Sequence, residues 1–271
     1  MNYESAAYDN RDANNPTFYI TVDETNGPLV KFTPDADAVL DALSTNDFSN
    51  LLHTTGPTVK YEYFKVTSID DSNGVGTFEW TSDLYEGRLS ASSYHIQGEG
   101  IDIRNGELFY TTKSSRYLFV VDLDNGTFVR SSTDSGAFDS QPDQVARVLN
   151  FTGDGATDDI LYFCEDGGDN CGVHGRDAQG RFFTILKNGG SNFSGETTGL
   201  AFSPDGLFMY VSFQNPGIIF EIHRTDGLPF QGQRLDIKYH QSEDNSNPFR
   251  DRMIFEDNAK TCELNSFMCY D

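Results

Sequence analysis

The chain has 271 residues, and 42 acidic residues against 19 basic ones give it a net charge of -23 at pH 7. This balance argues against a nucleic-acid partner, because phosphates are repelled where no basic patch exists. No apolar stretch reaches the roughly 18 residues that a membrane span needs. The acidity fits either solubility in a salty extracellular medium or acids that gather at one site to bind divalent cations.

Short apolar runs separated by turn residues follow one another along the chain, as expected for many short strands. The first group predicts strands at residues 4–8, 17–21 and 29–32. An insertion of about 60 residues follows, from about 35 to 95. Within it, residues 35–43 have the one convincing helical pattern.

The second group, residues 99–130, is the clearest. Its predicted strands are 100–103, 107–112, 117–123 and 127–130, and Asn-Gly turns at Asn105 and Asn125 indicate an antiparallel meander. The third group predicts strands at 145–149, 160–164 and 181–186, with a Gly-rich acidic loop before the last. The fourth predicts strands at 199–202, 208–213 and 217–222, the first two joined by the turn Ser203-Pro-Asp-Gly206.

Four-stranded meanders in series are the building units of a β-propeller. We therefore predict an all-β fold: a β-propeller over residues 1–232, with about four recognisable blades, and a C-terminal extension over residues 233–271. A β-sandwich is the alternative, and it would need long Greek-key crossovers instead of this run of hairpin turns.

The four cysteines form two pairs of identical spacing, Cys164 with Cys171 and Cys262 with Cys269. An even count suggests disulfides, and local pairing is the simplest of the three connectivities. We therefore predict a Cys262–Cys269 disulfide in the extension. For Cys164 a disulfide is favoured over ligation of a metal by its thiolate.

The disulfides, together with glycosylation sequons, favour a secreted, extracellular glycoprotein. The three sequons begin at Asn125, Asn150 and Asn192. The first residues have neither the basic nor the apolar region of a signal peptide. A signal has therefore been removed, or the chain begins inside a longer one.

In a propeller blade, the start of the first strand and the end of the second lie at the same mouth of the central channel. The residues at these positions are mostly acids: Glu4 with Asp23 and Glu24, Glu99 with Lys113, Asp143 with Glu165 and Asp166, and Glu196 with Gln214. Carboxylates this close bind cations or have raised pKa values. Oxygen ligands favour calcium, whereas the five histidines show no zinc-binding spacing.

No nucleophile elbow, Walker A loop or dinucleotide fingerprint occurs. Chemistry at this mouth would therefore be metal chemistry.

Several motifs, in this order, resemble the eukaryotic branch of the PhoX-type alkaline phosphatase family. They are Tyr3-Glu-Ser-Ala-Ala-Tyr-Asp9, Glu99-Gly-Ile-Asp102, Gln141-Pro-Asp-Gln144, Phe163-Cys-Glu-Asp-Gly-Gly168, Glu196-Thr-Thr-Gly-Leu-Ala-Phe-Ser-Pro-Asp-Gly206 and Gln214-Asn-Pro-Gly217. The resemblance covers nearly all of the chain before about residue 232. Ser-Pro-Asp-Gly is common among propellers, so the specificity lies in the ordered set.

The resemblance implies a six-bladed propeller that hydrolyses phosphate monoesters with calcium and iron at its channel mouth. The metal ligands that it implies are Glu4, Asp23, Glu99, Glu165, Asp166 and Glu196. Where family members have a basic residue, this chain has Gln97, and Lys113 is the catalytic residue expected to contact phosphate instead. About four blades instead of six predict a C-terminal portion or a shortened member, with the missing blades supplied by another segment or chain.

Two functions of different kinds follow. The first is a metal-dependent phosphatase acting on a phosphate ester. The second is a non-catalytic extracellular propeller, stabilised by calcium, that binds a protein or a glycan. A lactonase-like metal hydrolase is a third option, which rests on fold analogy alone.

Overall fold

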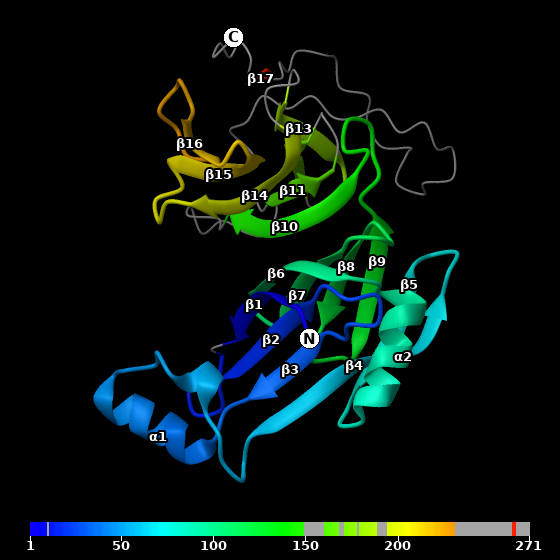
Figure 1. Cartoon of the computed structure of the whole chain (residues 1–271), viewed down its shortest axis with the longest axis vertical. Coiled ribbons are helices and arrows are strands. Elements are labelled where there is room, and N and C mark those ends of the chain that lie inside the picture. Colours follow the sequence, from blue (N-terminus) through cyan, green and yellow to red (C-terminus); the bar gives the residue numbers. More distant parts are fainter. Residues whose placement is uncertain are drawn as a thin grey trace. The chain divides into compact units, whose positions relative to one another are not determined.

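The structure is a computed structural model that describes residues 1–9, 11–148, 160–167, 171–177, 179–188, 194–230 and 262–263. Over these residues the chain is all-β, with two curled antiparallel sheets: one is nearly closed and barrel-like, and the other is a half-barrel (Figure 1). The sheets belong to two compact units, Met1–Ser131 and Ser132–Asp271, named unit 1 and unit 2 below. Each unit is described by itself.

Unit 1 contains one sheet of nine antiparallel strands in the order β1-β2-β3-β4-β5-β9-β8-β7-β6. The strands are β1 (Tyr3–Asp9), β2 (Thr17–Val22), β3 (Val30–Thr33), β4 (Lys60–Asp70), β5 (Val75–Thr81), β6 (Gly98–Arg104), β7 (Glu107–Thr112), β8 (Tyr117–Asp122) and β9 (Thr127–Ser132). The edge strand β6 returns to β1 and β2, where the Thr21 hydroxyl donates to the Glu99 carbonyl. This contact nearly closes the sheet.

Aromatic rings fill the inside of this sheet. The Phe64 ring lies 4.6 Å from Phe78 and 5.8 Å from Trp80 between centroids, and Tyr110 stacks on Phe119 at 4.8 Å. Each buried ring contributes about 1.5–3 kcal/mol relative to an exposed one. Trp80 is the only tryptophan of the chain, so its fluorescence reports on unit 1.

Helix α1 (Ala36–Thr45) confirms the helix predicted at residues 35–43. Its start follows from Asp35, whose carboxylate accepts a hydrogen bond from the Asp37 amide at 3.2 Å and so caps the first turn. Its end follows from Asn46, which adopts the left-handed conformation common at C-caps. A short 3-10 helix, η1 (Leu51–His53), follows.

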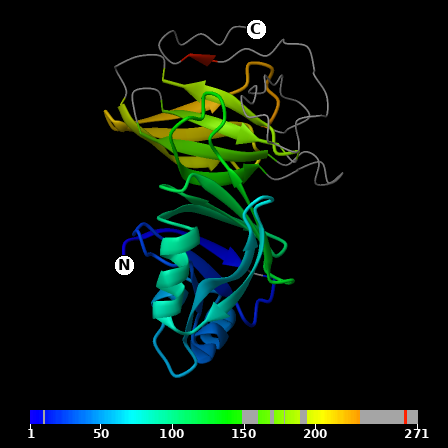
Figure 2. The same cartoon turned by 90° about the vertical axis from the view of Figure 1, so that its right-hand side faces the viewer.

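Helix α2 (Leu84–Tyr94) was not predicted, because small residues rather than a periodic apolar face hold it to the sheet. Gly87 lies against Tyr63 of β4, where an added Cβ would come within 2.4 Å of the Tyr63 side chain. The Ser90 hydroxyl accepts a hydrogen bond from the Val66 amide of β4. Figure 2 shows this helix lying along the sheet of unit 1.

The predicted insertion at residues 35–95 is part of the sheet rather than an appendage. Strand β4 pairs with β3 and β5, and β5 pairs with β9, for example Val75 with Val129. The first and second meanders therefore form one continuous sheet. The series of meanders is present, whereas the propeller and its blade number remain predictions.

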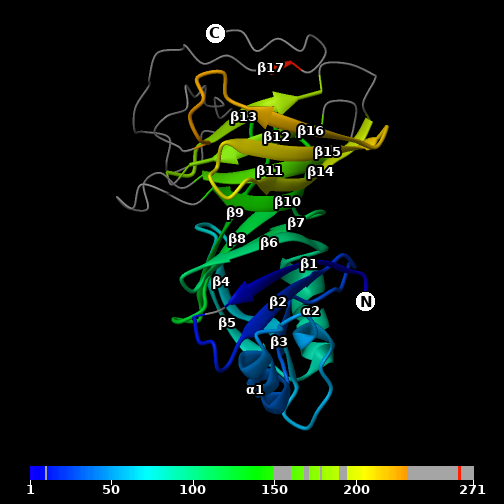
Figure 3. The same ribbon diagram turned by 90° about the vertical axis from the view of Figure 1, so that its left-hand side faces the viewer.

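Unit 2 has a sheet of eight strands, which can be followed in Figure 3. Seven follow the order β16-β15-β14-β11-β12-β13-β17, and β10 also pairs with β11. The strands are β10 (Gln141–Val148), β11 (Ile160–Asp166), β12 (Gly172–Arg176), β13 (Phe182–Lys187), β14 (Ser194–Phe202), β15 (Phe208–Asn215), β16 (Ile218–His223) and β17 (Cys262–Glu263). The predicted third and fourth meanders correspond to β10–β13 and β14–β16.

The structure corrects the expectation of a local disulfide between Cys164 and Cys171, because both thiols are free and buried. Cys164 lies opposite Val173 in the β11–β12 ladder, so the two cysteines do not face each other. Burial raises the pKa of both thiols, that of Cys171 to about 11. They therefore stay protonated and act as small apolar side chains of the core.

Several sequence predictions lie outside the described residues. They are the Cys262–Cys269 disulfide, because Cys269 is outside, and the sequons at Asn150 and Asn192. In the described part of the chain, no helix is long and apolar enough to cross a membrane.

His95 follows α2 and lies fully buried among aromatic rings, 5.4 Å from Phe64 and 6.2 Å from Tyr110 between centroids. Its Nε2 lies 3.3 Å from the Ser90 hydroxyl. Burial disfavours the imidazolium and lowers the pKa of His95 to about 3. The folded unit 1 therefore holds this histidine neutral over the whole mildly acidic range.

We expect unit 1 to lose stability as the pH falls below 6.5. Below this pH His95 is protonated in the unfolded chain but stays neutral in the folded chain, so protons favour the unfolded state. Stability from this residue is fully present above pH 6.5, and about 2 kcal/mol is lost between pH 7 and pH 5. Urea unfolding followed by Trp80 fluorescence measures this loss. The variant His95→Gln removes the titration, and an equal loss in wild type and variant would contradict the assignment.

Candidate functional site

An extra residue interrupts the first strand of every meander near its beginning. In unit 1, the three-residue step from Tyr3 to Ala6 on β1 stands against a two-residue step, Val22 to Ile20, on β2. The same shift lies between Gly98 and Ile101 in β6, between Pro142 and Val145 in β10, and between Ser194 and Thr197 in β14. Each is a β-bulge, which turns a side chain away from the regular alternation of the strand.

Every one of these bulges contains an acid. The four are Glu4, Glu99, Asp143 and Glu196. Bulges are frequent beside active sites, where they redirect side chains. Glu4, Glu99 and Asp143 are the first residue of their bulge, and Glu196 is the second. The repeated placement makes these four carboxylates the candidate functional residues of the meanders.

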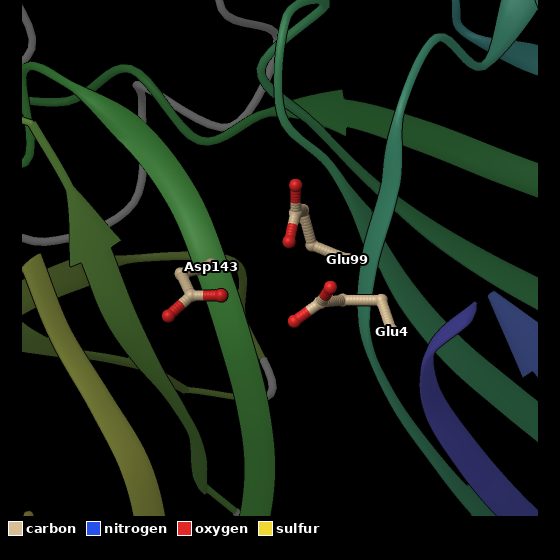
Figure 4. Close-up of side chains that lie close together, drawn as sticks. All are labelled: Glu4, Glu99 and Asp143. Atoms are coloured by element: carbon tan, nitrogen blue, oxygen red, sulfur yellow. The ribbon is translucent and has the colours of Figure 1, made fainter. Parts of the chain in front are cut away.

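In unit 1 the bulged acids Glu4 and Glu99 form a pair. A carboxylate oxygen of Glu4 lies within 4.8 Å of one of Glu99, and Figure 4 shows both side chains. Glu4 is exposed, whereas Glu99 is only 3% exposed. Two carboxylates at this distance, one of them buried, favour a shared cation.

Buried threonines supply hydrogen-bond partners for the backbone of both bulges. The Thr21 hydroxyl accepts from the Ser5 amide at 3.1 Å, and the Thr111 hydroxyl donates to the Gly100 carbonyl at 3.3 Å. Both threonines are fully buried. These hydrogen bonds supply partners for backbone groups at the interrupted ladder, and they fix the strand segments that carry Glu4 and Glu99.

Lys113 lies beside the acid pair, with its Nζ 3.6 Å from Oε1 of Glu99. Gln97 fixes the surrounding loops: its carbonyl accepts from the Lys113 amide at 2.8 Å, and its side-chain amide donates to Asp23 at 2.9 Å. The Ser114 hydroxyl also donates to the Gln97 side chain. The predicted catalytic lysine and the predicted ligand Asp23 are thus connected through one residue.

In unit 2 the acids gather along the first two strands of its meanders. Asp143 is 7% exposed in the bulge of β10, and it is the buried acid drawn in Figure 4 from this unit. Asp166 at the end of β11 stands opposite Glu196 of β14 in the ladder. The Gln214 side chain donates to Glu196 at 2.9 Å, which fulfils the predicted pairing of these two positions.

Glu165 has a different environment from the other predicted ligands. Its Oε1 accepts from the Asp139 and Ser140 amides at 3.1 and 2.9 Å. Its Oε2 accepts from the Gly172 amide at 3.0 Å and lies 2.9 Å from Nε2 of His174. A carboxylate has about four acceptor sites, and these contacts occupy them all. This carboxylate is therefore built into the fold of unit 2 and has little capacity left for a metal.

The structure thus places the six predicted ligands in three environments, one of which is the hydrogen-bonded enclosure of Glu165. Glu4 and Glu99 lie together, with Lys113 and Asp23 connected around them in unit 1. Asp166 and Glu196 face each other in unit 2. Asp143 was predicted at the channel mouth but was not among the six predicted ligands. It has the bulge position of Glu4 and Glu99. The signal that could have identified it is the acid in the motif Gln141-Pro-Asp.

We expect Glu165→Gln to destabilise unit 2 by about 2–4 kcal/mol while leaving calcium affinity almost unchanged, because an amide cannot accept hydrogen bonds on both sides. Unfolding of unit 2 is measured by alkylation of Cys164 and Cys171 in increasing urea, resolved by mass spectrometry. Glu196→Gln is the matched control and should show the opposite pattern. A large loss of calcium affinity in Glu165→Gln would make it a ligand after all.

Comparison with known proteins shows a similarity of fold. No family model matches this sequence, and no curated protein matches it either. Among solved structures, PhoX of Pseudomonas fluorescens, in complex with the transition-state analogue vanadate, is similar with a TM-score of 0.57 and 16% identity. The match covers 84% of this chain and 54% of the PhoX chain, so this chain spans about half the length of that protein. The protein described here therefore has a PhoX-like fold.

Proposed function

We propose that this protein is a metal-dependent, phosphatase-like hydrolase of phosphate monoesters. The observation that carries the proposal is an acid within the bulge that interrupts the first strand of each of the four meanders. The likeness to a phosphatase that binds vanadate supports a phosphoryl substrate. We propose calcium as the metal, with iron as a second metal of the same site.

The residues of unit 1 fit a hard cation. Glu4 and Glu99 offer only oxygen atoms, which calcium prefers, and their closeness gives a negative site that a divalent ion neutralises. In the described residues no histidine or cysteine is part of this group of potential ligands. Glu99 would hold the ion from the buried side and Glu4 from the exposed side.

A bound cation would supply positive charge to the phosphoryl oxygens and lower the pKa of an attacking water. The chain contributes orientation and charge around it. Thr21 and Gln97 fix the strand and loop that carry Glu99 and Lys113. Lys113 would neutralise the substrate's oxygens, which matters because a chain with a net charge of -23 otherwise repels phosphate.

Asp143, Asp166 and Glu196 are the ligands we propose in unit 2, since two of them lie in bulges equivalent to those of unit 1. Glu165 is proposed as a residue that supports the fold around them. A non-catalytic calcium-binding propeller is the alternative. It predicts bound calcium without hydrolysis.

We expect Glu99→Gln to lower kcat/KM for p-nitrophenyl phosphate by at least about a hundredfold, because it removes one charge from the buried side of the cation site. Metal content of the purified variant, measured by elemental analysis, should fall in parallel. Glu79→Gln, a neutralised acid that is 55% exposed on β5, is the control and should keep both.

A wild-type protein that binds calcium and hydrolyses no phosphate ester would refute the proposed activity and favour the alternative. Hydrolysis that survives Glu99→Gln unchanged would place the reaction elsewhere in the chain.

A further inference from the structure

Lys113 and a bound cation would compete for the same carboxylate. The lysine follows β7, and its ammonium lies 3.6 Å from Oε1 of Glu99, while Glu4 approaches the same carboxylate within 4.8 Å. Glu99 is 3% exposed and the Lys113 side chain 22% exposed, so the contact is largely shielded from water. Like charges repel strongly in such a place, and an ammonium and a divalent ion cannot both contact this oxygen at full strength.

The backbone of Lys113 is fixed, but its charge can move. The Lys113 amide donates to the Gln97 carbonyl at 2.8 Å, and the next residue, Ser114, donates to the Gln97 side chain. Gln97 itself has a left-handed backbone with φ of 57°. This anchored turn carries a flexible four-carbon stem, whose rotamers let the ammonium change partner without movement of the strands.

We infer that Lys113 is a metal-dependent switch for substrate: it pairs with Glu99 until a cation binds there, and the displaced ammonium then pairs with the phosphoryl oxygens. The inference rests on the proposed function, since it needs a cation on Glu99 and an anionic substrate. It adds a binding order, because a cation on Glu99 displaces the lysine toward the phosphate.

Thermodynamic linkage predicts the sign of the coupling between calcium binding and phosphate binding. If Lys113 opposes the cation, then phosphate that engages Lys113 relieves the opposition and tightens cation binding. Calcium and phosphate should therefore bind cooperatively in the wild type. A lysine that only supported the local fold would weaken calcium binding when removed.

The experiment is calorimetric titration of calcium into the 271-residue chain, with and without inorganic phosphate, for the wild type and for Lys113→Met. We expect Lys113→Met to bind calcium about tenfold more tightly than the wild type, because a like charge is removed beside the site. We also expect phosphate to tighten calcium binding in the wild type and to have no effect in the variant. Lys65→Met removes the same charge from a lysine that pairs with Glu79 and Glu86, and it should match the wild type.

Each contrary outcome refutes a different statement. Weaker calcium binding in Lys113→Met, or cooperativity that persists without the lysine, overturns the switch while the proposed phosphatase activity stands. A wild type that binds no calcium overturns both. Lys113→Arg keeps the charge, and a return of cooperativity in this variant would show that charge, and not fold, carries the effect.

Discussion

One extra residue at the start of each meander is the constraint on which the proposed site depends. A bulge interrupts the ladder of hydrogen bonds and leaves some backbone N–H and C=O groups without a partner on the neighbouring strand. Where these groups are buried, they need other hydrogen-bond partners. Thr21 and Thr111 provide them in unit 1 with fully buried hydroxyls. In unit 2, Thr197 follows the bulge of β14 and binds backbone groups of two neighbouring strands: its hydroxyl accepts from the Glu165 amide and donates to the Gly172 carbonyl. The acids are thus held by a repeated backbone device, which places them more firmly than a flexible loop would.

Charge is distributed unevenly between two kinds of acid in this chain. Glu165 has its oxygens filled by backbone amides and His174, so its charge is compensated within the fold. Glu4 and Glu99 stand close together, with Lys113 beside Glu99. Two carboxylates gathered in this way favour an external cation. Burial of a carboxylate therefore accompanies a structural role at Glu165 and a candidate ligand role at Glu99.

Local signals in the sequence predicted what local chemistry determines. The Asn-Gly turns predicted the second meander, and the helical pattern of residues 35–43 predicted α1, because turns and short helices are formed by residues close together in the sequence. Helix α2 was not predicted, because it contacts β4 through the small residues Gly87 and Ser90. Their small size shows its purpose only when the position of β4 is known. Cys164 and Cys171 have a spacing that suits a disulfide, and only the register of β11 with β12 shows that they do not face each other.

The candidate site shows the same division. The sequence shows directly that acids begin the first strands, and the family resemblance selected most of them as ligands. It does not show that Glu165 is structural, because this depends on the amides of Asp139 and Ser140, which lie far from Glu165 in the sequence. Nor does it show the position of Asp143, because the bulge exists only once β10 and β11 pair.

The pairing of β5 with β9 has a consequence for how unit 1 folds. It joins residues 75–77 to residues 127–129, so α2 and β6 to β8 lie in the loop between them. Closing such a loop costs entropy before its contacts are gained, and the cost is lower once β6 to β9 have already collapsed into a hairpin stack. The last ladder to form then locks both meanders at once. Unit 1 should therefore open as one cooperative body rather than as two separate meanders.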